Sequence, residues 1–290
     1  MGKVIHGEKD SEILRLHHLG WNSVQIGQHL EMHRSTVSRR LEGLKPRFPD
    51  MPVYSGIPEI KGDAIVAGDI QIPTTDWAFC ARVPVVAEKW DIPNLIIAGD
   101  LLNLDAFSSF PITEKLAAFK TELETARTLL DSWSHAFKNI YYIMGNHEQR
   151  IFRWSKGEMD AELLQYLIAQ EKLEAFNESR ANLISSGVNW RITHQDAYSV
   201  YAGKVGQELA LKYQTNVITH HEHRSAVTRD RFNRYTVIQN GGLHNIDTMH
   251  YVNQYDNARP VMTQSFVMVR NGVGHLLTPY SDMTDWSLYL

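Results

Sequence analysis

The sequence lacks the features of a secreted or membrane-bound protein. Cys80 is the only cysteine among 290 residues, which excludes an internal disulfide and a cysteine-rich zinc site. No apolar run approaches the roughly 18 residues that span a membrane, and no charged and then apolar signal segment opens the chain. Internal repeats and low-complexity tracts are absent as well. We therefore expect a soluble protein of the cytoplasm, without a membrane partner.

Charge is distributed unevenly along the chain. The net charge is −4, but residues 1–47 contain eight Lys or Arg against five Asp or Glu, so this segment carries +3 and the remainder −7. A small basic module ahead of a larger acidic domain fits this asymmetry. Prolines and glycines follow the basic segment and indicate a linker. We predict a first domain at residues 1–47, a linker at 48–60 and a second domain at 61–290.

The first domain is predicted to form three short helices, because apolar residues recur there at helical spacing. Asn22 is a suitable cap for the second helix. The run "IGQHLEMHRSTVSRRL" resembles the helix-turn-helix of site-specific recombinases and bacterial regulators, except that Glu31 stands where a glycine often makes the turn. In that motif the last helix enters the major groove of DNA. The resemblance implies the following contact residues: Arg34, Ser35, Thr36, Ser38, Arg39 and Arg40.

Two uses of this module stay open at the level of sequence. Arginines and hydroxyl groups on one helix can bind guanine edges and phosphate oxygens, which favours DNA as the partner. In the alternative, the three helices serve protein contacts or dimerisation, and the arginines form a solvated face. A helix-turn-helix often works as a dimer, which makes a homodimer the assembly to test.

Five apolar, strand-like runs of the second domain end in polar residues that can bind a metal ion. The runs are "AIVAGDIQ", "NLIIAGDLLN", "NIYYIMGNHEQR", "WRITHQD" and "NVITHHEHR". Helical patterns lie between the first three, and strands that alternate with helices indicate an α/β fold. Sites in such sheets form beyond the carboxyl ends of the strands, where these polar residues fall. One such end is usually a turn, but five together indicate a metal centre.

These runs resemble the motifs of the calcineurin-like metallophosphoesterases. The family series is Asp-x-His, Gly-Asp-x-x-Asp/Asn, Gly-Asn-His-Asp/Glu, a lone His and Gly-His-x-His, and the chain offers counterparts in the same order. The resemblance covers roughly residues 63–245. It implies a sandwich of mixed β-sheets flanked by helices, preceded here by the small all-α module. It also implies hydrolysis of phosphate esters with two divalent metal ions.

The resemblance implies a role for each matching residue. Asp100 bridges the two ions and belongs to the catalytic set. His147 is the catalytic imidazole near the leaving group, and Arg150 contacts phosphate or pairs with Glu148. Oxygen and nitrogen ligands without a thiolate favour Mn²⁺, with Fe, Zn²⁺ or Mg²⁺ as alternatives. The implied ligands are Asp69, Gln71, Asp100 and His223 for one ion, and Asp100, Asn146, His194 and His221 for the other.

Two residues depart from the family pattern. Gln71 replaces a histidine, and its amide oxygen is expected to bind a metal ion more weakly than an imidazole would. His220 replaces a glycine, and we expect its side chain either at the rim of the site or in a turn that faces solvent. His244 and His250 are expected to be structural or surface residues.

Three functions fit the sequence. The first is a phosphodiesterase (nuclease) or an end-processing phosphatase that the basic module directs to DNA. The chain resembles small phosphoesterases of tailed phages and prophages, which would place it in the cytoplasm of the host. The second is a phosphatase or diphosphatase for small nucleotides or phosphoproteins, with a regulatory helical module. The third is a DNA-binding regulator without enzymatic activity, but a degenerate domain would be expected to lose Asp100 or His147 first.

Overall fold

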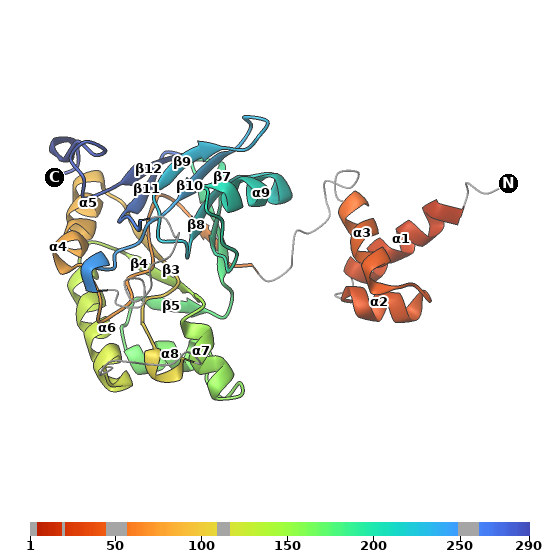
Figure 1. Cartoon of the computed structure of the whole chain (residues 1–290), viewed down its shortest axis with the longest axis horizontal. Helices are drawn as coiled ribbons and strands as arrows, with labels where there is room; N and C mark the ends of the chain where they lie inside the picture. The colour runs from red at the N-terminus through yellow and green to blue at the C-terminus, as the bar shows by residue number, and fades with distance from the viewer. Residues whose placement is uncertain (1–4, 19–20, 45–56, 109–116, 249–260) are drawn as a thin grey trace. The chain divides into compact units, whose positions relative to one another are not determined.

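The computed structural model in Figure 1 describes residues 5–18, 21–44, 57–108, 117–248 and 261–290. The chain divides into two compact units, Met1–Gly56 and Ile57–Leu290. Most of the predicted linker at 48–60 lies outside the described residues. Its predicted end is wrong, because β1 (Glu59–Lys61) pairs in parallel with β6 (Arg180–Ser185) and is therefore part of the second unit.

The first unit contains the three predicted helices. They are α1 (Ile5–His18), α2 (Ser23–His29) and α3 (Arg34–Leu44). Asn22 caps α2 as predicted, because its side-chain oxygen accepts hydrogen bonds from the backbone N–H groups of Val24 and Gln25. Glu31 has a left-handed backbone with φ of 52°, the conformation that a glycine adopts without strain. The buried apolar core of this unit consists of Ile13, Leu14, Leu16, Ile26, Val37 and Leu41.

The second unit is built on two mixed six-stranded sheets, which confirms the predicted sandwich. Strands of sheet 1 lie in the order β12, β11, β2, β3, β4, β5, and strands of sheet 2 in the order β1, β6, β7, β8, β10, β9. Sheet 1 is formed by β2 (Ala64–Ala67), β3 (Asn94–Ala98), β4 (Asn139–Ile143), β5 (Leu173–Phe176), β11 (Phe266–Arg270) and β12 (Val273–Leu277). Sheet 2 is completed by β7 (Val188–His194), β8 (Asn216–His220), β9 (Ala226–Arg229) and β10 (Thr236–Gln239).

Helices cover the outer faces of both sheets (Figure 1). The strands of sheet 1 are apolar on both sides: in β2, Ile65 packs toward the helices, while Val66 packs between the two sheets. Among the described residues, no helix has the length and apolarity needed to cross a membrane. The helices that cover sheet 1 are α4 (Trp77–Cys80), α5 (Arg82–Trp90), α6 (Phe119–Trp133), α7 (Glu148–Trp154) and α8 (Ala161–Ile168). Sheet 2 is covered by α9 (Lys204–Tyr213).

Parallel pairing brings the carboxyl ends of the central strands to one edge of each sheet. In sheet 1, β2 pairs with β3 and β3 pairs with β4, all in parallel. In sheet 2, β7 and β8 are parallel, and His194 is the register partner of His220. The segments that follow these five strands are the ones that carry the predicted ligands.

Candidate metal centre and helical module

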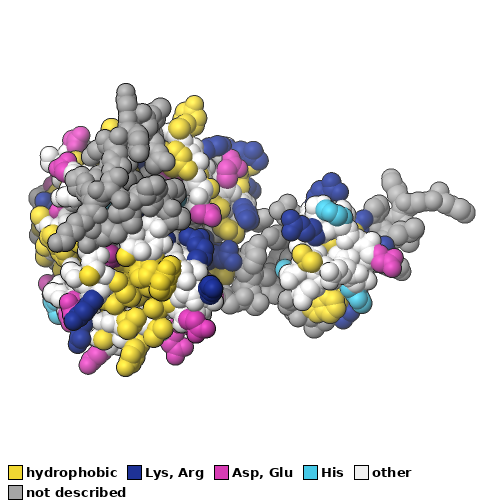
Figure 2. All heavy atoms as spheres, turned by 60° about the horizontal axis from the view of Figure 1, so that its bottom comes forward, with side chains coloured by type: hydrophobic (Ala, Val, Ile, Leu, Met, Phe, Trp, Pro, Cys, Tyr) yellow, Lys and Arg dark blue, Asp and Glu magenta, His cyan; other side chains and the backbone are white. Residues whose placement is uncertain are grey.

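The predicted DNA-contact residues lie on α3, and most of their side chains are accessible. Thr36 and Arg40 are half-buried. The guanidinium of Arg40 lies 3.1 Å from the carboxylate of Asp10 in α1. Figure 2 shows Lys, Arg and His side chains close together on part of this unit. The exposed residues of the predicted set are Arg34, Ser35, Ser38 and Arg39.

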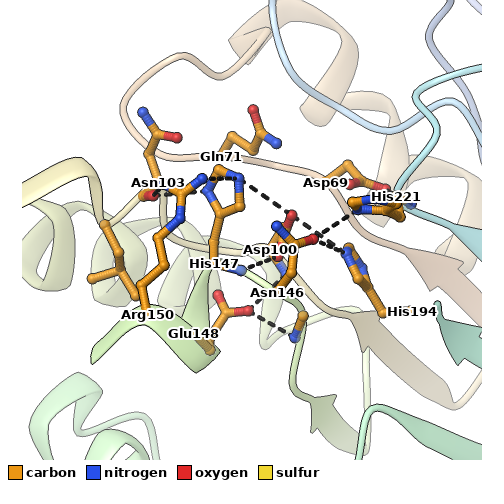
Figure 3. A network of polar contacts seen from close by, with 12 residues as sticks. Asp69, Gln71, Asp100, Asn103, Asn146, His147, Glu148, Arg150, His194 and His221 are labelled. Atoms are coloured by element: carbon orange, nitrogen blue, oxygen red, sulfur yellow. Dashed lines mark hydrogen bonds and ion pairs between the residues drawn. The ribbon is translucent and has the colours of Figure 1, made fainter. Parts of the chain in front are cut away.

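Three strands of sheet 1 position the first ligand-type residues. Asp69 follows β2, Asp100 follows β3 and Asn146 follows β4. Asp69 and Asp100 have left-handed backbones, with φ of 48° and 51°, which turn the chain sharply at the end of each strand. Gly145 allows the close approach of these ends, because a Cβ atom there would lie 2.0 Å from Asp100 Oδ1. The side chains thus lie side by side in Figure 3.

Two strands of sheet 2 position the histidines. His194 is the last residue of β7, and His220 is the last residue of β8. His221 and His223 follow with left-handed backbones, φ of 94° and 54°, so the chain coils tightly after β8. The backbone N–H of His221 donates a 3.1 Å hydrogen bond to Asp69 Oδ2, which connects the ends of the two sheets.

Asp100, Asn146, His194 and His221 form the first cluster of candidate ligands. The donor atoms of Asp100, His194 and His221 lie within 4.8 Å of one another. Asn146 Oδ1 lies 2.9 Å from His194 Nε2 and 2.7 Å from His221 Nδ1 (Figure 3). The structure therefore brings together all four residues that the resemblance assigns to one ion.

The ring of His194 has the orientation of a metal ligand. Its Nδ1 donates a 2.9 Å hydrogen bond to the carbonyl oxygen of Ala98, so Nε2 faces the cluster. Burial lowers the pKa of His194, but the carboxylates of Asp100 and Asp69 outweigh it and raise the pKa to about 10. Without a metal ion, a proton therefore occupies Nε2, and a divalent ion would displace that proton.

Asp69, Gln71 and His223 form the second cluster. His223 Nε2 lies 3.2 Å from Asp69 Oδ1 and 3.2 Å from Gln71 Nε2. A half turn of the Gln71 amide would exchange its nitrogen and oxygen and present Oε1 at this point. Asp69 Oδ1, Gln71 Oε1 and Asp100 Oδ2 are buried and make no hydrogen bond. Buried oxygens without partners are costly, and divalent ions would satisfy all three, so the donor set fits such ions.

Both central carboxylates are ionised. Burial raises the pKa of Asp69, but the imidazoles of His223 and His194 outweigh it and hold the pKa well below its ordinary value. The same balance applies to Asp100, whose pKa is lowered by His147 and His194. Two buried negative charges at the junction of the sheets therefore attract cations.

His147 and Arg150 lie together beside Asp100. His147 Nδ1 lies 2.7 Å from the carbonyl oxygen of Asn103, and Nε2 lies 2.9 Å from Arg150 Nη2. A guanidinium only donates, so Nε2 accepts and the ring proton resides on Nδ1. Burial lowers the pKa of His147 to about 4, which makes the ring neutral at pH 7. Arg150 Nη1 donates 2.9 Å hydrogen bonds to Asn103 O and Asp105 Oδ1.

The expected alternative of an Arg150–Glu148 pair is wrong. Glu148 is fully buried, and its carboxylate accepts backbone hydrogen bonds from Asp100 and Gly145, at 2.9 and 2.8 Å (Figure 3). Arg150 instead pairs with Asp105, as described above. Glu148 therefore ties together the loops that follow β3 and β4.

The structure contradicts the expectation for His220. Its side chain is fully buried, neither at the rim nor in a solvent-facing turn, and Nδ1 lies 3.4 Å from Asp69 Oδ2. His244 is also buried, with its ring centroid 4.4 Å from that of His223 and Nδ1 3.3 Å from Asp69 O. Sequence reasoning had no signal for His244 because none of the matched motifs includes it. His250 lies outside the described residues.

Comparisons with known proteins found similar chains among solved structures. No family model matches the sequence, and no curated protein matches it. Among solved structures, the chain is similar to the phosphoesterase YfcE from E. coli (14% identity, 77% of this chain and 95% of that one, TM-score 0.42). Vps29 from Chaetomium thermophilum (11%, 78% and 92%, 0.43) and the nuclease MPE from Pseudomonas putida (14%, 74% and 87%, 0.32) are also similar.

Replacing Gln71 with histidine should tighten one metal ion. An imidazole nitrogen is a stronger ligand than an amide oxygen for Mn²⁺ or Zn²⁺, so we expect a gain of about tenfold, or about 1.4 kcal/mol. Calorimetric titration of the full chain with Mn²⁺ measures this. Gln71→Leu offers no ligand and should lose affinity at the same site. Equal affinities in all three proteins would mean that Gln71 is not a ligand.

Glu122 of α6 supports the loop that carries Asn103. The side chain is buried, and Oε2 accepts a 2.9 Å hydrogen bond from the backbone N–H of Leu104. Burial raises the pKa of Glu122 to about 7, and the charge of Asp105 adds to this effect. At a pH between the ordinary pKa of glutamate, 4.5, and about 7, the folded protein therefore keeps a proton on Glu122 that the unfolded chain has released. This contribution to stability is present at low pH and is lost as the pH rises through about 7.

We expect the free energy of unfolding of the wild type to fall, relative to that of Glu122→Gln, by about 2–3 kcal/mol between about pH 4 and about pH 8. Glutamine retains an acceptor for Leu104 and does not ionise. Urea unfolding of both proteins at several pH values measures the difference, in which all shared titrating groups cancel. A difference independent of pH would show that Glu122 does not titrate in this range.

Proposed function

We propose that the chain is a metal-dependent phosphoesterase with a centre for two divalent ions, of the calcineurin-like type. The observation that carries the proposal is the convergence of all seven candidate ligands on two adjoining clusters, with buried oxygens of Asp69, Gln71 and Asp100 that accept no hydrogen bond at their centre. Asp69, Gln71 and His223 would hold one ion, and Asp100 would lie between the two. The other ion would be held by Asn146, His194 and His221 together with Asp100.

Bound ions of this kind polarise a phosphate and lower the pKa of a coordinated water, and Mn²⁺ is the first ion to test. The residues of the chain have separate tasks. Asp100 holds negative charge at the junction, and Asn103 orients His147 through its carbonyl oxygen. Arg150, fixed by Asp105, offers a guanidinium beside His147 that can turn to a phosphate oxygen.

This arrangement couples substrate binding to the protonation of His147. In the free protein Arg150 occupies Nε2 of His147, and its charge contributes to the low pKa of that ring. A bound phosphate attracts Arg150 and adds negative charge, so Nε2 is freed and the pKa of His147 rises. His147 then acts as the acid that protonates the leaving oxygen.

The substrate class we propose is nucleic acid, cleaved as a phosphodiester or trimmed at its ends. The basic, exposed face of α3 supports delivery of DNA by the first unit, and a homodimer of the chain is the assembly we propose to test first. A phosphatase or diphosphatase for small nucleotides or phosphoproteins is the alternative. The same metal chemistry serves both, so only substrate comparison separates them.

An assay with added Mn²⁺ tests the activity. It compares a nitrophenyl monoester, the bis-nitrophenyl diester, and single- and double-stranded DNA and RNA. We expect turnover of at least one of these, a loss of about 10³-fold or more in Asp100→Ala and of about 10²–10⁴-fold in His147→Ala. Asp131→Ala and His135→Ala, which alter surface residues of the same types, should keep full activity.

Two results would count against this proposal. The absence of metal-dependent turnover on every substrate would overturn the enzymatic function. Full activity in Asp100→Ala would overturn the residue assignment instead.

The salt dependence of DNA binding tests the role of α3. Arg34→Ala/Arg39→Ala in the full chain removes two exposed charges, and we expect weaker binding and a reduction of about 2 in the slope of log Kd against log salt concentration. Arg15→Ala is the matched control, because Arg15 pairs with Glu12 within α1 and should not contact DNA. Equal slopes in wild type and double variant would assign the module to protein contacts.

A further inference from the structure

We propose that His220 is a positioning residue, which orients the carboxylate of Asp69 so that one of its oxygens is reserved for a metal ion. The inference rests on the proposed function, since it concerns the affinity of the same centre. It assigns a role to the histidine that replaces the glycine of the family pattern.

The two oxygens of Asp69 have different surroundings. Oδ2 accepts the 3.1 Å hydrogen bond from the backbone N–H of His221 and lies 3.4 Å from Nδ1 of His220. Oδ1 makes no hydrogen bond and lies 3.2 Å from Nε2 of the candidate ligand His223. Residues at the end of β8 thus contact Oδ2, while Oδ1 faces His223 of the second cluster.

The tautomer of His220 follows from its surroundings. A neutral imidazole carries one proton, on either Nδ1 or Nε2. A proton on Nε2 would leave the lone pair of Nδ1 facing the ionised Asp69 and would leave a buried N–H without a partner. A proton on Nδ1 would face Oδ2 across 3.4 Å and avoid both costs. Asn240 Nδ2 lies 3.5 Å from Nδ1, and a protonated Nδ1 does not accept a hydrogen bond from it.

Gly68 provides the space for this contact. A Cβ atom on Gly68 would lie 2.6 Å from His220 Nδ1 and 2.9 Å from the carbonyl oxygen of Ala98. The imidazole therefore packs against backbone that has no side chain, one residue before Asp69. In the family pattern that the sequence resembles, a glycine occupies the position of His220. In this chain that position carries an imidazole, and Gly68 supplies the backbone without a side chain against which the imidazole packs.

The contact between His220 and Asp69 would matter most for the ion that Gln71, Asp69 and His223 would bind together. An amide oxygen is a weaker ligand than the imidazole of the family pattern, so more of the binding free energy depends on Asp69 and His223. A carboxylate free to rotate pays entropy when it binds an ion, and a fixed one does not. Loss of an outer hydrogen-bond partner of a ligand typically costs 10–100-fold in metal affinity.

The test is Mn²⁺ binding by the full chain, measured by calorimetry and by electron paramagnetic resonance, which distinguishes an isolated Mn²⁺ from a coupled pair. His220→Leu keeps an apolar side chain of similar size without a donor, and His220→Asn places an N–H near the position of Nδ1. We expect His220→Leu to lose about 10–100-fold in affinity at one site only, so that isolated Mn²⁺ replaces the coupled pair. His220→Asn should stay within a few-fold of the wild type.

Gly68→Ala provides a second route if His220→Leu does not fold. It retains His220 but displaces the ring, and we expect the same selective loss at one site. Unchanged affinities in His220→Leu or Gly68→Ala, or equal losses in His220→Leu and His220→Asn, would overturn the positioning role. A wild type that binds no Mn²⁺ at either site would overturn the proposed function itself, which is a distinguishable outcome.

Discussion

The buried carboxylate of Asp100 joins three strand ends, and the rest of the site depends on it. Oδ1 accepts the backbone N–H of His147 at 2.9 Å, and Oδ2 lies 3.4 Å from Nε2 of His194. Its own backbone N–H is bound by Glu148. A buried charge with fewer partners would destabilise the fold, so the ends of β3, β4 and β7 have to meet at this point. Parallel pairing within each sheet brings these strand ends to the same edge.

The sandwich and the convergence of the candidate ligands were predictable because their signals are local. Where a strand is followed by Gly-Asp or Asn-His, the strand and its candidate ligand lie within a few residues of each other in the sequence. Asn22 likewise lies within three residues of the backbone amides that it caps. The roles of His220 and Glu122 were not predictable, since each contacts a partner far along the chain. The end of the linker was missed for the same reason: β1 pairs with β6, more than a hundred residues later.

In the proposed metal centre, protons and metal ions would occupy the same ligand atoms. In the metal-free chain, the charges of Asp69 and Asp100 raise the pKa of His194 to about 10, so this imidazole is protonated. Buried carboxylates and histidines tolerate each other in this way without a cation. The fold can therefore assemble its ligand geometry first, and metal binding then releases protons rather than building the site.

The neutral state of His147 bears on which esters the centre can cleave. Burial lowers the pKa of His147 to about 4, so the ring is neutral at pH 7 and the free protein has almost no acid ready for a leaving oxygen. Arg150 contributes to that low value, and it is also the group that a phosphate attracts. In the proposed mechanism the acid would form only when substrate displaces the guanidinium, and an ester too small or too weakly charged to move Arg150 would bind without being activated. Selection among phosphate esters would then lie in Arg150 and Asp105 rather than in the metal ligands.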